Sequence, residues 1–122
     1  MSAVASILAI TLFLAFVTSG LQKVLFNPIV SQSADHLGFT KRAYQRIGGL
    51  EVAGGIGLLV GLAARGGSFW GIINEVAAAG LTVLMAAAVI THLRMGDGVK
   101  LFTPALALAV LALVELIFRL TQ

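Results

Sequence analysis

The sequence predicts an all-α fold, an integral membrane antiparallel four-helix bundle that forms a single domain over residues 1–122. Of the 122 residues, 59% are hydrophobic and only 11% are charged, whereas a soluble domain carries about 25% charged residues. The chain therefore has too few polar side chains to cover a soluble globule. Its apolar residues also gather in four long runs, which is typical of membrane spans.

The expected spans are residues 3–26, 47–64, 69–93 and 101–120. Each is long enough to cross a hydrocarbon core of about 30 Å at a rise of about 1.5 Å per residue. A cleaved signal peptide is the alternative for the first span. However, residues 1–26 have no positively charged beginning, and their apolar part is longer than that of a usual signal peptide.

The breaks between the spans contain residues that favour turns. They lie at residues 27–28, 65–67 and 95–98. Because the second and third connections are short, neighbouring spans are expected to be antiparallel. The first connection, up to about residue 40, is longer and mixes apolar with polar residues. A short amphipathic piece at the membrane interface and a plain surface loop both fit it.

Basic residues indicate how the bundle is oriented. Alternating spans put both termini and the second connection on one side, which then holds Arg65 and Arg119. The opposite side holds six basic residues, namely Lys23, Lys41, Arg42, Arg46, Arg94 and Lys100. Because basic loops stay in the cytoplasm, the side with six basic residues is expected to face the cytoplasm and both termini are expected outside. The net charge of +3 then indicates contact with anionic lipid headgroups, and no nucleic acid is expected.

Small residues in the second span indicate how the helices pack. Ala53, Gly57 and Gly61 recur every four residues and share one face, and the two glycines form a GxxxG pair. Since lipid is as apolar as a leucine side chain, helices in a membrane associate through such close contacts. Packing inside the bundle is the favoured interpretation, and a face for homo-oligomers is the alternative.

Three ionisable residues are expected at one depth in the bundle. Lys23 ends the first span, Glu51 lies one turn into the second, and His92 ends the third. A carboxylate at the centre of a membrane helix costs about 2.5–3.5 kcal/mol, so Glu51 needs a partner. Arg46 lies about 140° away around the same helix. Glu51 is therefore predicted to meet Lys23, or otherwise His92 or Arg94, from another helix.

This polar cluster has three possible roles, which the residues leave open. It is a structural ion pair that fixes the helix register, a binding site for a quinone headgroup or other small ligand, or a group that handles protons or ions. A second cluster is expected towards the other face. There Glu115 and Arg119 are spaced to pair on one helix, and Glu75 lies deeper in the third span. A structural role is favoured for this second cluster.

The residue types in this sequence give little support to a cofactor or a metal site. The chain has no cysteine, and its only histidines are His36, in the first connection, and His92. Haem is therefore disfavoured, and no metal site is expected because the histidines and carboxylates lack a metal-binding spacing. No nucleophile–base pair of the hydrolase type is apparent. Catalytic residues remain unknown, and the protein is not expected to be catalytic on its own.

Three short motifs resemble those of the DoxX-like family of small four-span bacterial membrane proteins. They comprise Gly20 with Lys23, then Arg46, Gly48 or Gly49 and Glu51, and finally His92 with Arg94. The family takes its name from a small subunit of an archaeal thiosulfate:quinone oxidoreductase. The resemblance implies the four-helix fold and a role for these matched residues.

The function that the resemblance implies is an accessory subunit of a membrane-associated oxidoreductase assembly, with membrane or membrane-associated proteins as partners. Its cluster of Lys23, Glu51 and His92 would organise one end of the bundle, around a quinone or another small ligand. A small enzyme subunit that reacts with quinone directly is one alternative. A transporter or channel is another, and it would require self-association because four short helices leave little room for a pore.

Overall fold

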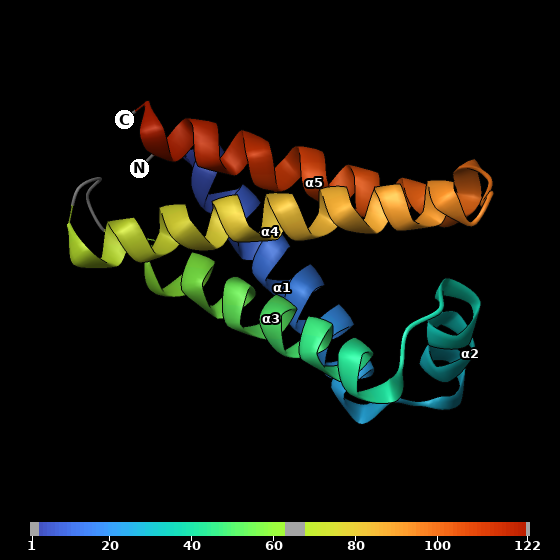
Figure 1. Ribbon diagram of the computed structural model, residues 1–122. Helices are drawn as coiled ribbons and strands as arrows, with labels where there is room; N and C mark the ends of the chain where they lie inside the picture. The colour runs from blue at the N-terminus through green and yellow to red at the C-terminus, as the bar shows by residue number, and fades with distance from the viewer. Residues whose placement is uncertain (1–2, 63–67, 122) are drawn as a thin grey trace.

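The computed structural model describes residues 3–62 and 68–121, and these residues form helices joined by short connections. The helices are α1 (Ala3–Leu25), α2 (Pro28–Leu37), α3 (Lys41–Val60), α4 (Phe69–Arg94) and α5 (Val99–Leu120). The two labelled chain ends lie at the same end of the molecule, and α2 lies at the opposite end (Figure 1). The all-helical prediction is confirmed for the described residues.

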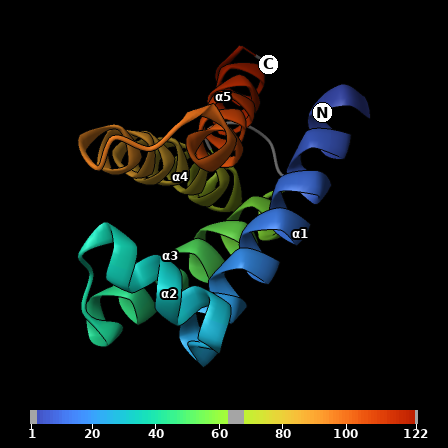
Figure 2. The ribbon, with the colours of Figure 1, turned by 90° about the vertical axis from the view of Figure 1, so that its right-hand side faces the viewer.

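The long helices form two pairs, which meet where α3 contacts α4 and where α1 contacts α5. Helix α1 packs along α3, α4 packs along α5, and α3 also contacts α4. The pairs lie close together near the chain ends and diverge towards the end that carries α2 (Figures 1 and 2). A core that includes Leu12, Phe16, Leu58, Leu81 and Ala112 joins the two pairs. The divergence leaves room between them at the α2 end.

Three of the described helices are long and apolar enough to cross a membrane, namely α1, α4 and α5. Helix α3 is not among them, so the predicted bundle of four spans is not confirmed. The difference has a physical reason, because α3 carries four charged residues within its first eleven positions, namely Lys41, Arg42, Arg46 and Glu51. The helix begins six residues before the predicted span, where the Thr40 hydroxyl accepts a hydrogen bond from the Ala43 amide.

The first connection forms a helix, α2, which the sequence interpretation had left open. Asn27 caps it by accepting a hydrogen bond from the Val30 amide at 2.9 Å, and Pro28 occupies its first turn. Gly38 ends it at a φ of 80°, a conformation that glycine adopts without steric cost. Its apolar face, with Val30 and Ala34, packs against Tyr44 of α3. Helix α2 is therefore anchored to the protein and amphipathic.

Glycines let α3 sit at the centre of the helix contacts. A Cβ added to Gly57 would lie 2.8 Å from the Ala77 Cβ of α4, and one added to Gly61 would overlap the Asn74 Cβ. These two predicted packing residues therefore face α4 within the chain. Ala53, the third member of the predicted face, is exposed. Glycines on other sides of α3 meet α1, which allows neighbours on both sides.

Candidate functional site

The candidate site begins with an ion pair between α1 and α3. The Lys23 Nζ lies 2.5 Å from the Glu51 Oε1, and it also donates a hydrogen bond to the Ser19 hydroxyl at 2.9 Å. The side chain of Glu51 is 1% exposed and that of Lys23 is 17% exposed. The contact that helix geometry predicts for Glu51 is therefore present, with the first of the expected partners.

Two glycines bring the helices close enough for this pair to form. A Cβ on Gly48 would lie 2.6 Å from the Gly20 carbonyl oxygen and 2.7 Å from the Lys23 Cβ. A Cβ on Gly20 would in turn overlap the carbonyl oxygen of Gly48. The α1–α3 crossing therefore depends on the absence of side chains at both positions. It places Lys23 directly beside the helix face that carries Glu51.

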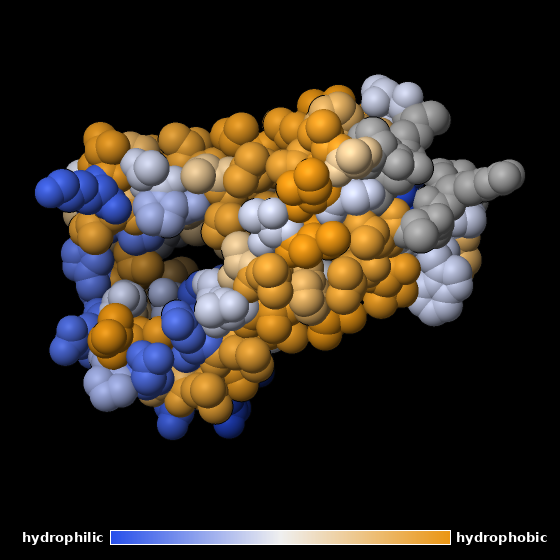
Figure 3. Space-filling view, turned by 180° about the vertical axis from the view of Figure 1, so that it is seen from behind, coloured by the Kyte–Doolittle hydropathy of each residue, from blue (hydrophilic) through white to orange (hydrophobic). Residues whose placement is uncertain are grey.

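A cavity of about 230 Å³ lies against the ion pair. Its polar lining comprises Ser19, Lys23, Tyr44, Glu51, Thr91 and His92, and its other walls are mostly apolar residues of α3, α4 and α5. The view from behind shows a hollow between two lobes at the end that carries α2, with hydrophilic residues around it (Figure 3). A few polar groups in an otherwise apolar cavity are typical of small-ligand sites.

Glu51 is only partly satisfied in this cavity. Its Oε1 accepts from Lys23, but its Oε2 is buried and has no hydrogen-bond partner among the described residues. Tyr44, on the same face of α3, packs its ring 5.6 Å from the Phe39 ring, and the Lys23 Nζ lies 5.7 Å from the centre of the Tyr44 ring. A buried oxygen without a donor is costly, so a donor brought to the Oε2 would stabilise this end of the bundle.

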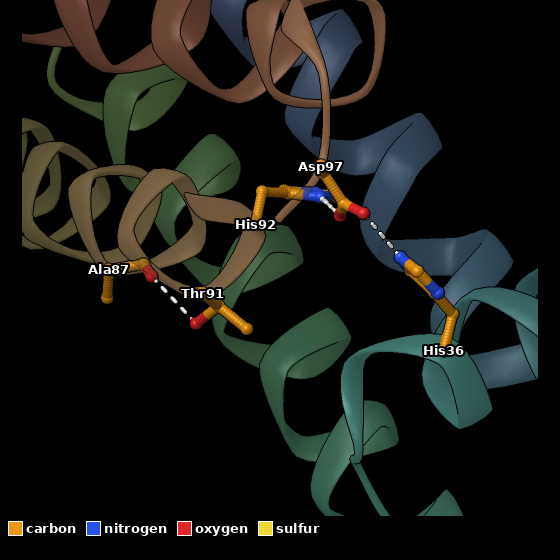
Figure 4. Close-up of polar contacts among 5 residues, drawn as sticks. All are labelled: His36, Ala87, Thr91, His92 and Asp97. Carbon is orange, nitrogen blue, oxygen red and sulfur yellow. Dashed lines mark hydrogen bonds and ion pairs between the residues drawn. The ribbon is translucent and has the colours of Figure 1, made fainter. Parts of the chain in front are cut away.

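A second polar contact links two segments at the same end of the molecule. The Asp97 carboxylate, in the α4–α5 connection, lies 2.6 Å from the His36 Nε2 of α2 and 2.7 Å from the His92 Nδ1 of α4 (Figure 4). The Asp97 side chain is only 4% exposed. The hydrogen bonds from His92 and His36 lower the pKa of Asp97 below its ordinary value. Asp97 therefore remains an anion that ties α2 to the α4–α5 connection.

The predicted cluster is thus assembled in part. Lys23, Glu51 and His92 all line the cavity, but His92 bonds to Asp97, whereas the Glu51 Oε1 is taken by Lys23. Arg46 and Arg94 are exposed and do not line it. Sequence reasoning missed Asp97, which it treated only as part of a turn, and it left His36 as a loop residue. A contact between residues 61 positions apart leaves no local signal in the sequence.

The second predicted cluster lies at the end of the molecule near the chain termini. Glu115 and Arg119 of α5 are buried, as is Asn74 of α4, whose side-chain amide donates to the Leu58 carbonyl at 2.7 Å. Glu75, the third member of this predicted cluster, is half-buried, and its greater depth in the membrane stays a prediction. Asn74 takes the inward position because it shares the buried face of α4 with Gly71 and Ala78.

The described residues contain no group of three or more His, Asp or Glu side chains that could hold a metal ion. They define a small helical membrane protein with a cavity at one end, in which a few polar side chains lie among apolar ones. The family comparison agrees, because the model of the DoxX-like family matches residues 7–114. The chain therefore belongs to the DoxX-like family, as its motifs predict. No curated protein and no solved structure matches it.

Proposed function

We propose that this protein binds a quinone headgroup in the cavity beside Lys23 and Glu51, as an accessory subunit of a membrane-associated oxidoreductase assembly. The observation that carries the proposal is the buried Glu51 Oε2, which lacks a donor although its carboxylate pairs with Lys23. Both carboxylate oxygens of Glu115 and the Asn74 Oδ1 are also buried without a partner among the described residues, but of these three residues only Glu51 lines the cavity.

The donors and acceptors of the cavity suit a quinone and its quinol. An ammonium group has three donors, and Lys23 uses two of them on Ser19 and Glu51. The third is available to a ligand carbonyl, while the Glu51 Oε2 accepts from a ligand hydroxyl. A sulfur oxyanion fits less well, because the Glu51 carboxylate would repel it while pairing with the nearest cation.

The size of the cavity points to a headgroup. Sites for drug-sized ligands measure about 300–1,000 Å³, and this cavity measures about 230 Å³. A single substituted ring fits such a volume, with its edge towards Lys23 and its faces against apolar side chains. The family resemblance supplies the association with an oxidoreductase assembly, in which a partner subunit carries the electron transfer.

The setting in the membrane completes the proposal. Three described helices are apolar enough to span, and α3 serves as the fourth crossing element, with its charged first turns at the interface. The cavity then lies near the cytoplasmic face of a bacterial cytoplasmic membrane, and both termini lie outside. Access from the lipid suits an apolar ligand that already dissolves there.

Binding to the purified protein tests the headgroup proposal. The protein in lipid nanodiscs is titrated with a dimethoxy-methyl-benzoquinone that lacks a tail, and binding is followed by calorimetry. Glu51→Gln should weaken binding of the corresponding quinol by roughly 10- to 100-fold, the value of a hydrogen bond to a charged group. Glu75→Gln, a matched change outside the cavity, should leave the affinity unchanged. Absence of binding by the unmodified protein would overturn the proposal.

The accessory role is tested by what the protein retains in its native membrane. Extraction in mild detergent followed by mass spectrometry should recover a subunit that carries a redox cofactor. Purification as a homogeneous protein, with quinone bound but no such subunit, would limit the conclusion to quinone binding and overturn the accessory role.

A further inference from the structure

A long apolar groove lies between α3 and α4. It encloses about 650 Å³, and no ionisable side chain lines it. Small residues such as Ala53, Gly57 and Gly80 form part of its lining. A Cβ added to Gly80 would meet nothing within 4 Å, so the groove is open at that point.

The groove and the polar cavity are neighbours in the structure. Leu84 and Ala87 of α4 line both of them. On α3, Leu50 lines the groove and Glu51, the next residue, lines the cavity. The side chains of Leu84 and Ala87 therefore form the boundary between the groove and the cavity, so a ligand with its polar part near Glu51 would have its tail next to the groove.

The length and exposure of the groove suit a hydrocarbon chain. Its lining extends along α4 from Ile72 to Ala87, which corresponds to about 22 Å at about 1.5 Å per residue. That distance covers most of a hydrocarbon core of about 30 Å. Val76 and Val83 are 66% and 68% exposed, so the groove opens towards lipid along its length.

A helix from a second copy fits the groove less well. Close helix packing in membranes uses small residues, but two of those that line the groove on α3, Gly54 and Gly57, are already packed against α4 within the chain. A Cβ on Gly54 would lie 2.6 Å from the Leu81 Cδ2, and one on Gly57 would lie 2.8 Å from the Ala77 Cβ. The space that remains is narrow and apolar, as a single extended chain requires.

We infer that the α3–α4 groove holds the hydrocarbon tail of the same molecule whose headgroup occupies the polar cavity. The ligand is then a membrane amphiphile with a small hydrogen-bonding head and one long tail, and it enters sideways from the lipid between α3 and α4. The inference rests on the proposed function for the identity of the head. It adds the tail, the route of entry and the residues that receive them.

Photo-crosslinking from the tail tests this inference. The probe is a benzoquinone whose alkyl tail carries a diazirine, added to the full-length protein in nanodiscs and illuminated. Mass spectrometry should locate the label on residues 50–57 and 72–87. An excess of unlabelled tailed quinone should remove it. Gly80→Leu, which fills open space in the groove, should reduce labelling there at least tenfold.

A matched variant keeps the result interpretable. Gly49 is also an exposed helical glycine with nothing within 4 Å of an added Cβ, and it lines neither the groove nor the cavity. Gly49→Leu should therefore leave labelling unchanged, and calorimetry with the tail-less benzoquinone should give the same affinity for both variants. This second measurement separates a filled groove from a misfolded protein.

The outcomes distinguish this inference from the proposed function. Binding of the tail-less quinone without label in the groove would overturn the inference and leave the headgroup site standing. Equal labelling of the groove by a diazirine fatty acid, with no competition by quinone, would assign it to ordinary lipid chains. If labelling of the groove were lost when the protein forms dimers in the nanodisc, the groove would be assigned to a second copy of the chain. Failure of the tail-less quinone to bind would overturn both proposals.

Discussion

Glu51 shows how a single residue couples stability to a possible site. A carboxylate buried in a membrane protein without a partner is costly, and the Lys23 Nζ, 2.5 Å from the Oε1, offsets that cost at one oxygen only. The other oxygen is buried without a donor among the described residues. The pair therefore holds α1 against α3, and it leaves one buried carboxylate oxygen without a donor in a residue that lines the cavity.

A double-mutant cycle measures the coupling of this pair. Lys23→Met and Glu51→Gln should each lower the free energy of unfolding by about 3 kcal/mol, because each strands the other group in a buried site. The double variant should lose at least about 1 kcal/mol less than the sum. Unfolding in mixed detergent micelles, followed by circular dichroism, gives the four values. Strictly additive losses would show that the two side chains are not coupled.

Asp97 makes a pH-dependent contribution that can be worked out from its pKa. The hydrogen bonds from His92 and His36 lower that pKa from its ordinary value of 3.8. The stabilisation is therefore complete above the unfolded pKa and is lost as the pH falls through the lower, folded one. Asp97→Asn should lower the unfolding temperature at about pH 6. The difference in unfolding temperature from the unmodified protein should begin to shrink only below about pH 4 and should vanish once the pH lies below the folded pKa of Asp97.

Thermal unfolding of both proteins over this pH range checks the prediction, and Asp35→Asn provides the control. Asp35 is an exposed carboxylate of α2, so its replacement should shift the unfolding temperature little at any pH. A gap for Asp97→Asn that stayed constant down to the lowest pH would contradict the role assigned to the carboxylate charge.

At the scale of the elements, hydropathy predicts α1, α4 and α5 to within a residue or two because each is a nearly unbroken apolar run. It places the start of α3 too late, because the actual start is set by the Thr40 cap and the first turns are charged. The signals for α2 were present in the sequence as a capping Asn27, a Pro28 and a Gly38. The mix of apolar and polar residues in this segment also fits a surface loop, so these signals did not decide between a helix and a loop.

The α1–α3 crossing gives a prediction at this scale. Gly20→Ala should lower the free energy of unfolding by about 1–3 kcal/mol, the cost of overpacking, because the added Cβ would meet the Gly48 backbone, which cannot rotate away. Gly49→Ala faces open space and should be neutral or stabilising by up to about 1 kcal/mol. Detergent unfolding of both variants checks the difference, and equal effects would contradict the close crossing.

At the scale of the whole molecule, the sequence predicts which charges share a depth but not how the helix pairs diverge. Alternating spans were enough to bring Lys23, Glu51 and His92 to one end. The cavity depends on the angle between the α1–α3 and α4–α5 pairs, which follows from many side-chain contacts together. The His36–Asp97 contact depends on the same angle, because it joins α2 to the α4–α5 connection, whereas the His92–Asp97 contact is local.

The orientation of the molecule in the membrane is the last prediction. Both chain ends lie at one end of the structure and α2 at the other, so residues near the C-terminus and in α2 should face opposite compartments. The chain has no cysteine, so single cysteines introduced at Thr121 and Gln32, both exposed, act as unique labels. A membrane-impermeant maleimide added to intact bacterial spheroplasts should label the Thr121→Cys variant and spare Gln32→Cys, because the basic end stays in the cytoplasm. Lysis should make both reactive, and the reverse pattern before lysis would invert the topology and move the cavity to the outer face.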